Sequence, residues 1–374
     1  MLWIFLILIF IRPFVSSLAF PQANYLLSSL LLIFLAARLS LRRPCVRNHI
    51  PILYPFLSFF LAIFISFVFS QNRLVSIAET YKYLLGLLLF LYGLSLTKVD
   101  KDKIVWGLAL SGLFVSGLAI YQYLFGFKHI ADYLSRQNIS DPFLLDAITR
   151  KRVFSPFVTS SVLGGYLAMI IPLALSRKRK FLIIAPLTLA LLLTKSVSAS
   201  LSIFAGVLLY FFLEGRLNRN KILSIGGLWV LLLSVVMMRA ATSKEHLQPL
   251  FSTLMRLNYW TDTLKVIWSF PWTGLGLGNF NLAYSRYAHN SYLQLWAEMG
   301  ILGIASFLWL IFQIFKSALS NLRDNPGKIQ TISLITAAAV FLFHNLFEFT
   351  FFLPEVSILW WLILGLMISR LDPK

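Results

Sequence analysis

A histidine and an asparagine, His289 and Asn290, stand directly before an apolar stretch that starts at Ser291. The chain has only five histidines. An imidazole titrates near neutral pH, so it can take a proton from a hydroxyl group and pass it on. Asn290 has a side chain suited to capping the helix that follows. Two interpretations of His289 therefore stay open at this point: a capping histidine bonded to a carbonyl, or a general base.

A second histidine, His344, opens the segment "HNLFEFTFFLPE" at the end of another apolar stretch. Glu348 and Glu355 follow it closely in the sequence. Ionisable side chains at membrane depth usually serve a function. A purely structural polar contact fits His344 equally well, and we take His344 and Glu348 as possible supporting residues.

Cations form the second group of candidates. Arg150, Lys151 and Arg152 precede one apolar stretch, and Lys195 lies between two others. A long segment between apolar stretches contains Arg239, Lys244, Arg256, Lys265 and Arg286. Guanidinium groups bind phosphate through paired N–H donors, so this pattern predicts an anionic ligand such as a diphosphate. The alternative for each cation is snorkelling toward lipid headgroups.

The run "PWTGLGLGNF" places glycines at alternate positions, Gly274, Gly276 and Gly278. It lacks the strand-to-helix setting and the lysine of a phosphate-binding loop. We therefore expect a tight turn that returns the chain toward the membrane, and no nucleotide site.

Composition indicates which elements must position these residues. The chain has 374 residues, of which 59% are hydrophobic and 13% charged, and its mean hydropathy is +0.80. Soluble domains are about half apolar and about a quarter charged. Because backbone polar groups cannot remain unpaired in lipid, and no alternating barrel pattern occurs, we predict an all-α polytopic membrane protein.

Apolar stretches of bilayer-spanning length predict about twelve transmembrane helices. Two long loops, 127–156 and 240–290, are expected between them, within a single integral membrane domain, 1–374. The second loop contains an expected amphipathic helix, "LFSTLMRLNYWTDTLKVIWSF", with Trp260 and Trp268 as headgroup anchors. The expected spans are 2–20, 24–38, 50–70, 81–97, 104–126, 157–175, 181–194, 198–213, 222–239, 292–315, 329–347 and 355–370.

The net charge of +19 lies in short clusters between the apolar stretches, which is typical of membrane proteins and argues against nucleic acid as a partner. Placing six basic clusters inside puts both termini in the cytoplasm and both long loops outside. The clusters are Arg38 to Arg47, Lys98 to Lys103, "SRKRK", "EGRLNRNK", Lys316 to Lys328 and "RLDPK".

Cys45 is the lone cysteine, so neither a disulfide nor a structural metal site is expected. The first apolar stretch is expected to be an uncleaved helix.

The segment "HNSYLQLWAEMGILG" resembles the signature of the O-antigen ligase and polymerase superfamily. That signature is a histidine, then asparagine, serine or glutamine, nine residues, a glycine, two residues, and glycine, threonine or tyrosine. His289, Asn290, Gly300 and Gly303 match it with the spacing intact. The segments "MRLNYW", "PWTGLGLGNF", "RVFSPFVTSSVLGGYLAMIIPL", "LLLTKSVSASLSIFAG" and "HNLFEFTFFLP" are similar to further family segments, from Arg152 to Met367. One departure is Val197, which stands where the family usually has an arginine.

The resemblance implies a glycosyltransferase of the bacterial inner membrane that uses no metal, cofactor or nucleotide sugar. Its donor would be a glycan on undecaprenyl diphosphate, and its acceptor lipid A-core or another glycan. By the match, His289 would deprotonate the acceptor hydroxyl on the periplasmic face. Arg152 and Arg256 would hold the diphosphate, supported by Arg150, Lys151 and Lys195, and direct displacement would invert the anomeric carbon.

Several alternatives remain at this stage. A polymerase that joins lipid-linked repeats fits the same motifs as a ligase. A secondary transporter would place ionisable residues near the middle of the membrane, and an exporter of the same lipid would line a central lumen with cations. The sugars and the oligomeric state are not encoded in any pattern that we recognise.

Overall fold

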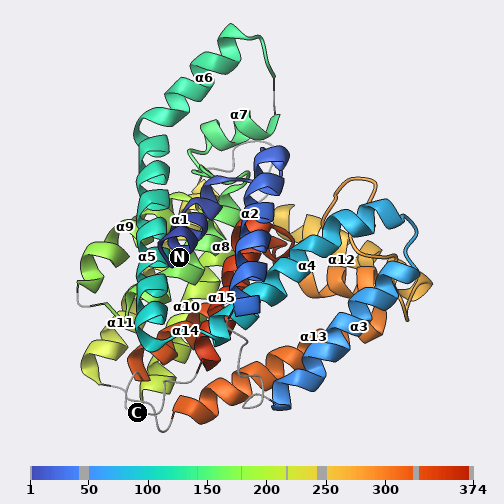
Figure 1. Ribbon diagram of the computed structural model, residues 1–374. Helices are drawn as coiled ribbons and strands as arrows, with labels where there is room; N and C mark the ends of the chain where they lie inside the picture. The colour runs from blue at the N-terminus through green and yellow to red at the C-terminus, as the bar shows by residue number, and fades with distance from the viewer. Residues whose placement is uncertain are drawn as a thin grey trace. The chain divides into compact units, whose positions relative to one another are not determined.

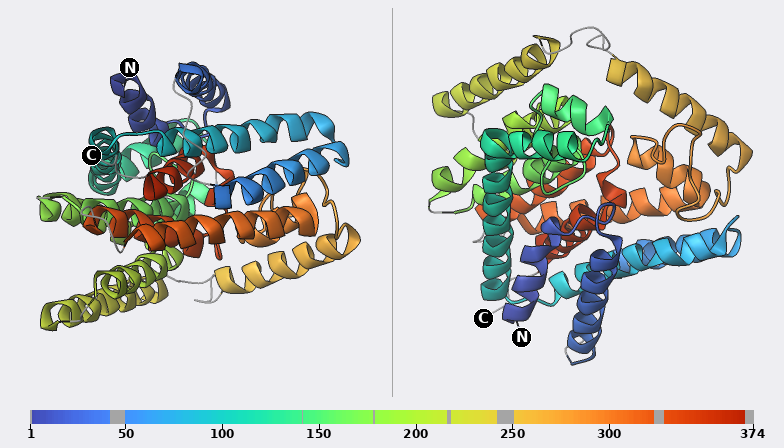
Figure 2. Two further views of the ribbon diagram at one scale, coloured as in Figure 1. Left: turned by 60° about the horizontal axis from the view of Figure 1, so that its bottom comes forward. Right: turned by 90° about the horizontal axis from the view of Figure 1, so that it is seen from above.

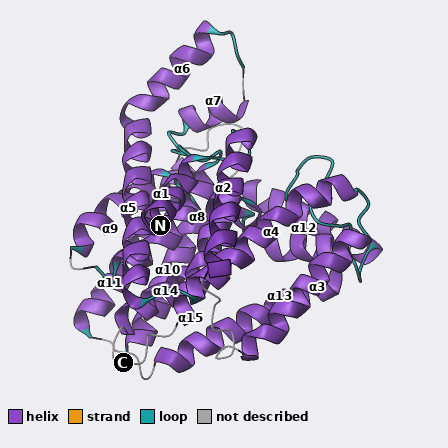
Figure 3. Ribbon diagram, viewed as in Figure 1, coloured by secondary structure: helices purple, strands orange, loops and turns teal. Residues whose placement is uncertain are grey.

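The computed structural model describes residues 2–41, 50–140, 142–177, 179–215, 218–241, 251–322 and 328–369. It is 81% helix, and these ranges contain no strand, only an isolated bridge between Leu282 and Ser285 (Figure 3). The expected all-α class is confirmed. Several residues singled out above lie outside the described ranges, namely Arg42, Arg43, Cys45, Arg47, Lys178, Arg216, Lys244 and the C-terminal 370–374.

Figure 1 shows the helices along the chain. In order they are α1 (Leu2–Ile11), η1 (Arg12–Phe14), α2 (Pro21–Leu41), α3 (Ile50–Val68), α4 (Arg73–Leu94), α5 (Lys98–Tyr121), η3 (Gln122–Gly126), α6 (Phe127–Arg136), α7 (Pro142–Thr149), α8 (Ser160–Ala174), α9 (Lys180–Leu193), α10 (Val197–Glu214), α11 (Arg219–Ala241), α12 (Phe251–Ser269), α13 (Ser291–Leu322), α14 (Lys328–His344), η4 (Thr350–Phe352) and α15 (Pro354–Ile368).

Seven of the described helical segments are long and apolar enough to cross a membrane: α2, α3, α4, α5 with its extension, α10, α11 and α13. Five shorter apolar helical segments, of 10–17 residues, are α1 with η1, α8, α9, α14 and α15. Each of these segments overlaps one of the apolar stretches expected from the sequence. The chain is thus a multi-pass membrane protein, and the number of twelve crossings stays a prediction.

The chain divides into two compact units. Unit 1 comprises Met1–Asn24, Lys103–Pro249 and Thr336–His344, and unit 2 comprises Tyr25–Asp102, Leu250–Ile335 and Asn345–Lys374. Whether the chain forms the single membrane domain expected from the sequence stays a prediction.

Unit 1 is built around α8, whose residues are buried except for Ser161. Glycines allow its neighbours to approach closely, as small residues do between membrane helices. A Cβ added to Gly164 would lie 2.8 Å from the Cβ of Ala199 in α10, and one added to Gly112 of α5 would lie 2.7 Å from Ile170. The helices α5, α8 and α10 therefore pack with almost no space between their backbones at these points.

The first expected loop, 127–156, differs from a simple loop at its start. The helix of α5 continues through the π-helical turn η3 into α6 and ends only at Arg136, because Gly126 keeps helical backbone angles. The side chain of Gln122 in η3 accepts hydrogen bonds from the backbone N–H groups of Phe154 (2.8 Å) and Ser155 (2.9 Å). This contact fixes the segment that directly follows Arg152.

In unit 2, α3 runs beside α13 and α4 runs beside α15 (Figures 1 and 2). Gly93 and Gly365 face each other, and a Cβ on Gly93 would lie 3.0 Å from the backbone of Gly365. Large aromatic rings fill the space between these helices. Among them Phe307 of α13 lies 5.7 Å from Phe59 and 5.3 Å from Phe351, measured between ring centroids.

The helix α13 is interrupted at Gly300, whose backbone adopts φ 66° and ψ −171°. The carbonyl oxygens of Ala297 and Glu298 accept hydrogen bonds at 2.9 Å from Leu275 and Gly276, in the glycine-rich run. These bonds satisfy carbonyls that the interruption takes out of the helix, as buried backbone groups require.

The glycine-rich run is the tight turn expected from the sequence. Gly274, Gly276 and Gly278 have φ values of 70°, 98° and 72°, which L side chains rarely adopt. A side chain at Gly300 would also collide with the carbonyl of Trp272. The turn therefore needs glycine on both sides of the contact, in the loop and in α13.

The helix α12 has three different faces. Thr263 and Ile267 are buried on one face, and a second, exposed face contains the apolar residues Leu264 and Trp268. The third face contains the polar residues Asn258, Asp262 and Lys265. Trp268 is 80% exposed. An exposed apolar stripe next to a polar one suits a helix that lies at a membrane interface, as expected from the sequence, and α12 is not among the candidate spans.

Candidate active site

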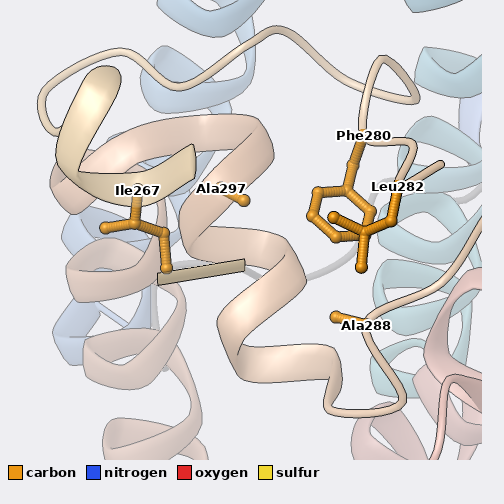
Figure 4. Close-up of a cluster of buried hydrophobic side chains, with 5 residues drawn as sticks. All are labelled: Ile267, Phe280, Leu282, Ala288 and Ala297. Atoms are coloured by element: carbon orange, nitrogen blue, oxygen red, sulfur yellow. The ribbon is translucent and has the colours of Figure 1, made fainter. Parts of the chain in front are cut away.

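A small hydrophobic cluster positions the segment that leads to His289. Ile267 of α12, Phe280 and Leu282 of the returning loop, Ala288, and Ala297 of α13 are all buried together (Figure 4). The cluster joins two helices to the loop between them, so the residue that follows Ala288 has little freedom of position. That residue is His289.

The backbone around His289 is held in an unusual conformation. His289 has φ 50°, in the left-handed region that non-glycine residues seldom occupy. The indole N–H of Trp260 donates to the carbonyl of His289 at 3.4 Å. The side-chain oxygen of Asn290 accepts from the N–H groups of Tyr292 (3.0 Å) and Leu293 (3.1 Å), so Asn290 caps α13 as expected.

The imidazole of His289 faces a buried carboxylate. Its Nδ1 lies 3.5 Å from Oε2 of Glu348, and the side chains of His289 and Glu348 are 27% and 1% exposed. The other carboxylate oxygen, Oε1, pairs with the guanidinium of Arg256. Glu348 thus contacts both His289, the predicted base, and Arg256, one of the two arginines predicted to hold the diphosphate.

Aromatic rings fix the plane of the imidazole. Tyr259 stacks on it, with ring centroids 5.2 Å apart and planes inclined by 19°. Phe349 meets it edge-on at 4.9 Å. Tyr259 belongs to "MRLNYW", and the helical spacing of three that places it one turn after Arg256 was the signal for its role.

The segment that contains Glu348 is attached to the start of α13. The N–H of Ser291 donates to the carbonyl of Asn345 at 2.9 Å, and its hydroxyl donates to the Asn345 side chain at 2.7 Å. The same hydroxyl lies 3.0 Å from the carbonyl of Glu348. Asn345 in turn accepts from the N–H of Phe351 at 2.8 Å. Ser291 and Asn345 therefore hold Glu348 beside His289, which no local sequence pattern showed.

The chemistry available to this arrangement is proton transfer. A carboxylate beside an imidazole favours one tautomer and stabilises the imidazolium that forms when the ring takes a proton. Arg256 pairs with that buried carboxylate, and an unpaired charge there would be costly. With Nδ1 facing Glu348, Nε2 is the nitrogen that remains to accept a proton.

Four further candidate cations belong to unit 1, namely Arg150, Lys151, Arg152 and Lys195. The ammonium of Lys195 donates to the carbonyl of Arg150 at 2.7 Å, and Nε of Arg152 donates to the carbonyl of Thr194 at 3.1 Å. Arg150 pairs with Asp146 at 2.7 Å. Burial lowers the pKa of Lys195 below its ordinary value, and the charges of Arg152, Lys151 and Arg150 lower that pKa further. These cations are held together against their repulsion, which suits an anion-binding site.

Two lysines of this group have left-handed backbones. Lys151 has φ 46° and follows α7, and Lys195 has φ 50° and follows α9. Glycine or asparagine is the usual residue at such helix ends. Among the described residues, the non-glycine residues with positive φ are these two, Asn138 and His289. Backbone strain of this kind is concentrated at functional sites.

The predicted residues thus form two groups, one in each unit. Unit 2 brings together His289, Asn290, Arg256 and Glu348. Unit 1 brings together Arg150, Lys151, Arg152 and Lys195. His344, also in unit 1, is fully buried at the end of α14 with its imidazole against Gly165 of α8. Within the described part of the chain, no group of three or more His, Cys, Asp or Glu side chains could hold a metal ion.

Residues 181–308 match a family model described as O-antigen ligase. The matched segment supports an assignment to the O-antigen ligase superfamily. The matched segment covers about a third of the chain and contains Lys195, Arg256, His289 and Asn290. No curated protein matches the chain.

The match supports a membrane glycosyltransferase of the ligase and polymerase family that acts on lipid-linked glycans. The O-antigen ligase segment includes α9, α10, α11 and α12 with the first half of α13. It also includes the interruption of α13 at Gly300 and the loop that bonds to it. Arg152, His344 and Glu348 lie outside the matched residues.

Proposed function

We propose that this protein transfers a glycan from undecaprenyl diphosphate to a sugar hydroxyl of lipid A-core, as an O-antigen ligase on the periplasmic face of the inner membrane. Both termini would be cytoplasmic, as the loop charges indicate. The observation that carries the proposal is the contact of buried Glu348 with both His289 and Arg256. Glu348 connects the proposed base, His289, to a cation, Arg256, and both of these residues lie in the matched family segment.

The proton step follows from the geometry at His289. Nε2 accepts the proton of the acceptor hydroxyl while that oxygen forms a bond to the anomeric carbon of the donor glycan. The bond between the anomeric carbon and the diphosphate oxygen breaks, and its electron pair leaves with the undecaprenyl diphosphate. Attack opposite to the leaving group inverts the anomeric carbon. Glu348 stabilises the imidazolium that results.

The second requirement is stabilisation of charge on the departing diphosphate. Arg256 has N–H donors besides the Nη2 that pairs with Glu348. Arg152 belongs to the cation group of unit 1, where burial and repulsion would both be relieved by an anion. We assign the diphosphate to these two arginines, with Arg150, Lys151 and Lys195 as supporting cations. Such preorganised donors act without moving during the reaction.

Purified protein in lipid nanodiscs, supplied with undecaprenyl-diphosphate-linked glycan and lipid A-core, tests the proposal. Transfer is expected with the intact protein, and His289→Ala is expected to reduce it by about 10²-fold to 10⁴-fold, the usual range for a general base. Transfer at a near-normal rate by His289→Ala would refute the base assignment. No transfer by the intact protein would favour a transporter or an exporter.

The same assay separates a ligase from a polymerase. A ligase lengthens lipid A-core and leaves undecaprenyl diphosphate behind, whereas a polymerase lengthens the lipid-linked glycan when no lipid A-core is present. Mass analysis of cells that lack the protein gives an independent reading. Accumulated lipid-linked polymer would support the ligase, and accumulated single repeats would show a polymerase instead.

A further inference from the structure

A polar cleft of about 360 Å³ opens on the exposed polar face of α12. Its lining residues are Met255, Asn258, Thr261, Asp262 and Lys265 of α12, and Tyr284 of the returning loop. Ligand pockets in proteins are about 300–1,000 Å³, so the cleft has room for a small ligand such as a sugar ring. None of these residues takes part in the proton or diphosphate steps described above.

The polar groups of the cleft are already ordered by one another. One carboxylate oxygen of Asp262 accepts from the ammonium of Lys265 at 2.7 Å. The other accepts from the hydroxyl of Tyr284. Asn258 adds an amide at the same surface, with both donor and acceptor capacity. A sugar offers neighbouring hydroxyl groups that need donors and acceptors at such short spacing.

An aromatic surface accompanies these polar groups. The ring of Tyr284 stacks on Tyr259 with centroids 5.4 Å apart, and Tyr284 is 49% exposed. A sugar ring combines an apolar C–H face with hydroxyl groups at its edge. A tyrosine, which is apolar on its face and polar at its tip, complements both parts. The combination of Tyr284 with Asp262 and Lys265 thus matches a sugar better than a purely apolar or a purely charged ligand.

The charge of the cleft distinguishes it from the cation group of unit 1. The opposite charges of Asp262 and Lys265 offset each other. Hydrogen bonds from Lys265 and Tyr284 lower the pKa of Asp262. The bond to Asp262 raises the pKa of Tyr284 to about 12. A phosphate would meet an ionised carboxylate here without surplus positive charge, so the cleft favours an uncharged ligand.

Tyr259 connects the cleft to the candidate base. The same ring that stacks with Tyr284 at 5.4 Å also stacks with His289 at 5.2 Å. The ring of Tyr259 therefore separates the cleft from His289.

We propose that this cleft on α12 binds an uncharged sugar residue of a glycan, next to the sugar that reacts at His289. A role of the cleft in glycan transfer rests on the proposed function, whereas binding of a sugar by the cleft does not. The donor glycan and the acceptor glycan are the two sources of such a sugar.

Binding is tested with the full-length protein in nanodiscs by saturation-transfer NMR, using glucose, galactose, N-acetylglucosamine and rhamnose as probes. At least one sugar is expected to receive saturation. Thr261→Trp, which fills the cleft from an exposed helix position, is expected to abolish the signal, and Asp262→Asn to reduce it at least about five-fold. Leu264→Trp is the matched control, exposed on the same helix but outside the cleft, and should bind as the intact protein does.

His289→Ala should also retain the saturation signal, which separates this inference from the transfer reaction. If no sugar of the set receives saturation, or if Thr261→Trp binds like the intact protein, the cleft is not a sugar site. Melting curves of the two tryptophan variants show whether both are folded. If Thr261→Trp proves to be unfolded, its loss of binding has no meaning, and the result with Asp262→Asn decides instead.

The transfer assay then identifies the source of the sugar. Thr261→Trp is expected to raise the KM of one glycan by about ten-fold while kcat changes little. A rise for lipid A-core assigns the cleft to the acceptor, and a rise for the lipid-linked glycan assigns it to the donor. If neither KM rises, the cleft plays no part in transfer and the proposal fails in that respect.

Discussion

Glu348 directs one carboxylate oxygen to the guanidinium of Arg256 and the other to Nδ1 of His289, while its side chain is 1% exposed. A single buried carboxylate thus stabilises positive charge on two residues with different proposed tasks. Its position depends on Ser291 and Asn345, which hold the segment against the start of α13. The relationship makes Glu348 a positioning residue for both.

Replacing Glu348 by glutamine tests this relationship. The variant keeps the shape of the side chain but removes the charge that stabilises the imidazolium, so kcat is expected to fall on the order of 100-fold. Glu348→Asp keeps the charge on a shorter side chain and should recover part of the rate. The kcat and KM values of both variants provide the measurement. Equal kcat for Glu348→Gln and the intact protein would contradict the role.

Asn290 and His289 are adjacent, yet their substitution should affect different properties. Asn290→Ala removes the cap of α13 and is expected to lower the free energy of unfolding by about 1 kcal/mol. His289→Ala leaves the cap intact and should reduce transfer far more than stability. Denaturant titration and the transfer assay on both variants separate the two effects. A loss of transfer in Asn290→Ala as large as in His289→Ala would show that the cap itself governs the reaction.

The sequence was sufficient for features that depend on local patterns. Apolar length alone predicted the helices, and the asparagine before Ser291 predicted the cap. The turn around Gly276 followed from its alternating glycines. These predictions succeed because each depends on residues that lie within a few positions of one another.

Other features depend on contacts between distant segments. Arg256 and Glu348 are 92 positions apart, and their pairing requires α12 and the segment after α14 to meet. The interruption at Gly300 was also not predicted, because the apolar pattern of α13 continues through it. Only the loop at Trp272 and Leu275, packed into the gap, shows why the helix opens there.

Gly300→Ala is expected to be strongly destabilising. An alanine would have to keep φ at 66° and would collide with the carbonyl of Trp272, so we expect a loss of at least about 2 kcal/mol in the free energy of unfolding. Gly226→Ala in α11 is the matched control. Nothing lies within 4 Å of a Cβ at that position, so alanine there should be neutral or stabilising by up to about 1 kcal/mol. Similar melting curves for the two variants would argue against a required interruption.

The left-handed backbone of Lys151 allows a test of whether this strained conformation serves anion binding. Its left-handed backbone suits glycine, so Lys151→Gly is expected to stabilise the protein by up to about 1 kcal/mol. The same change should weaken binding of inorganic pyrophosphate several-fold, because one cation of the group is lost. Asn138→Gly is the control, since asparagine tolerates the left-handed region and Asn138 is not in the cation group. Thermal melts and calorimetric titration with pyrophosphate measure both effects. Unchanged pyrophosphate affinity in Lys151→Gly would exclude Lys151 from the anion site.

The lowered pKa of Lys195 predicts how the affinity for an anion depends on pH. Burial and the neighbouring cations lower the pKa of Lys195 from 10.5, and a bound diphosphate would favour the ammonium and raise that pKa again. Binding therefore takes up a proton wherever Lys195 is partly neutral in the free protein. The affinity for pyrophosphate should rise as the pH falls through the window below 10.5, and level off once Lys195 is protonated in both states. Calorimetric titration in buffers of different ionisation enthalpy measures the proton uptake. Lys195→Arg, which stays charged throughout, should abolish the uptake, and uptake that persists in this variant would assign it to another group.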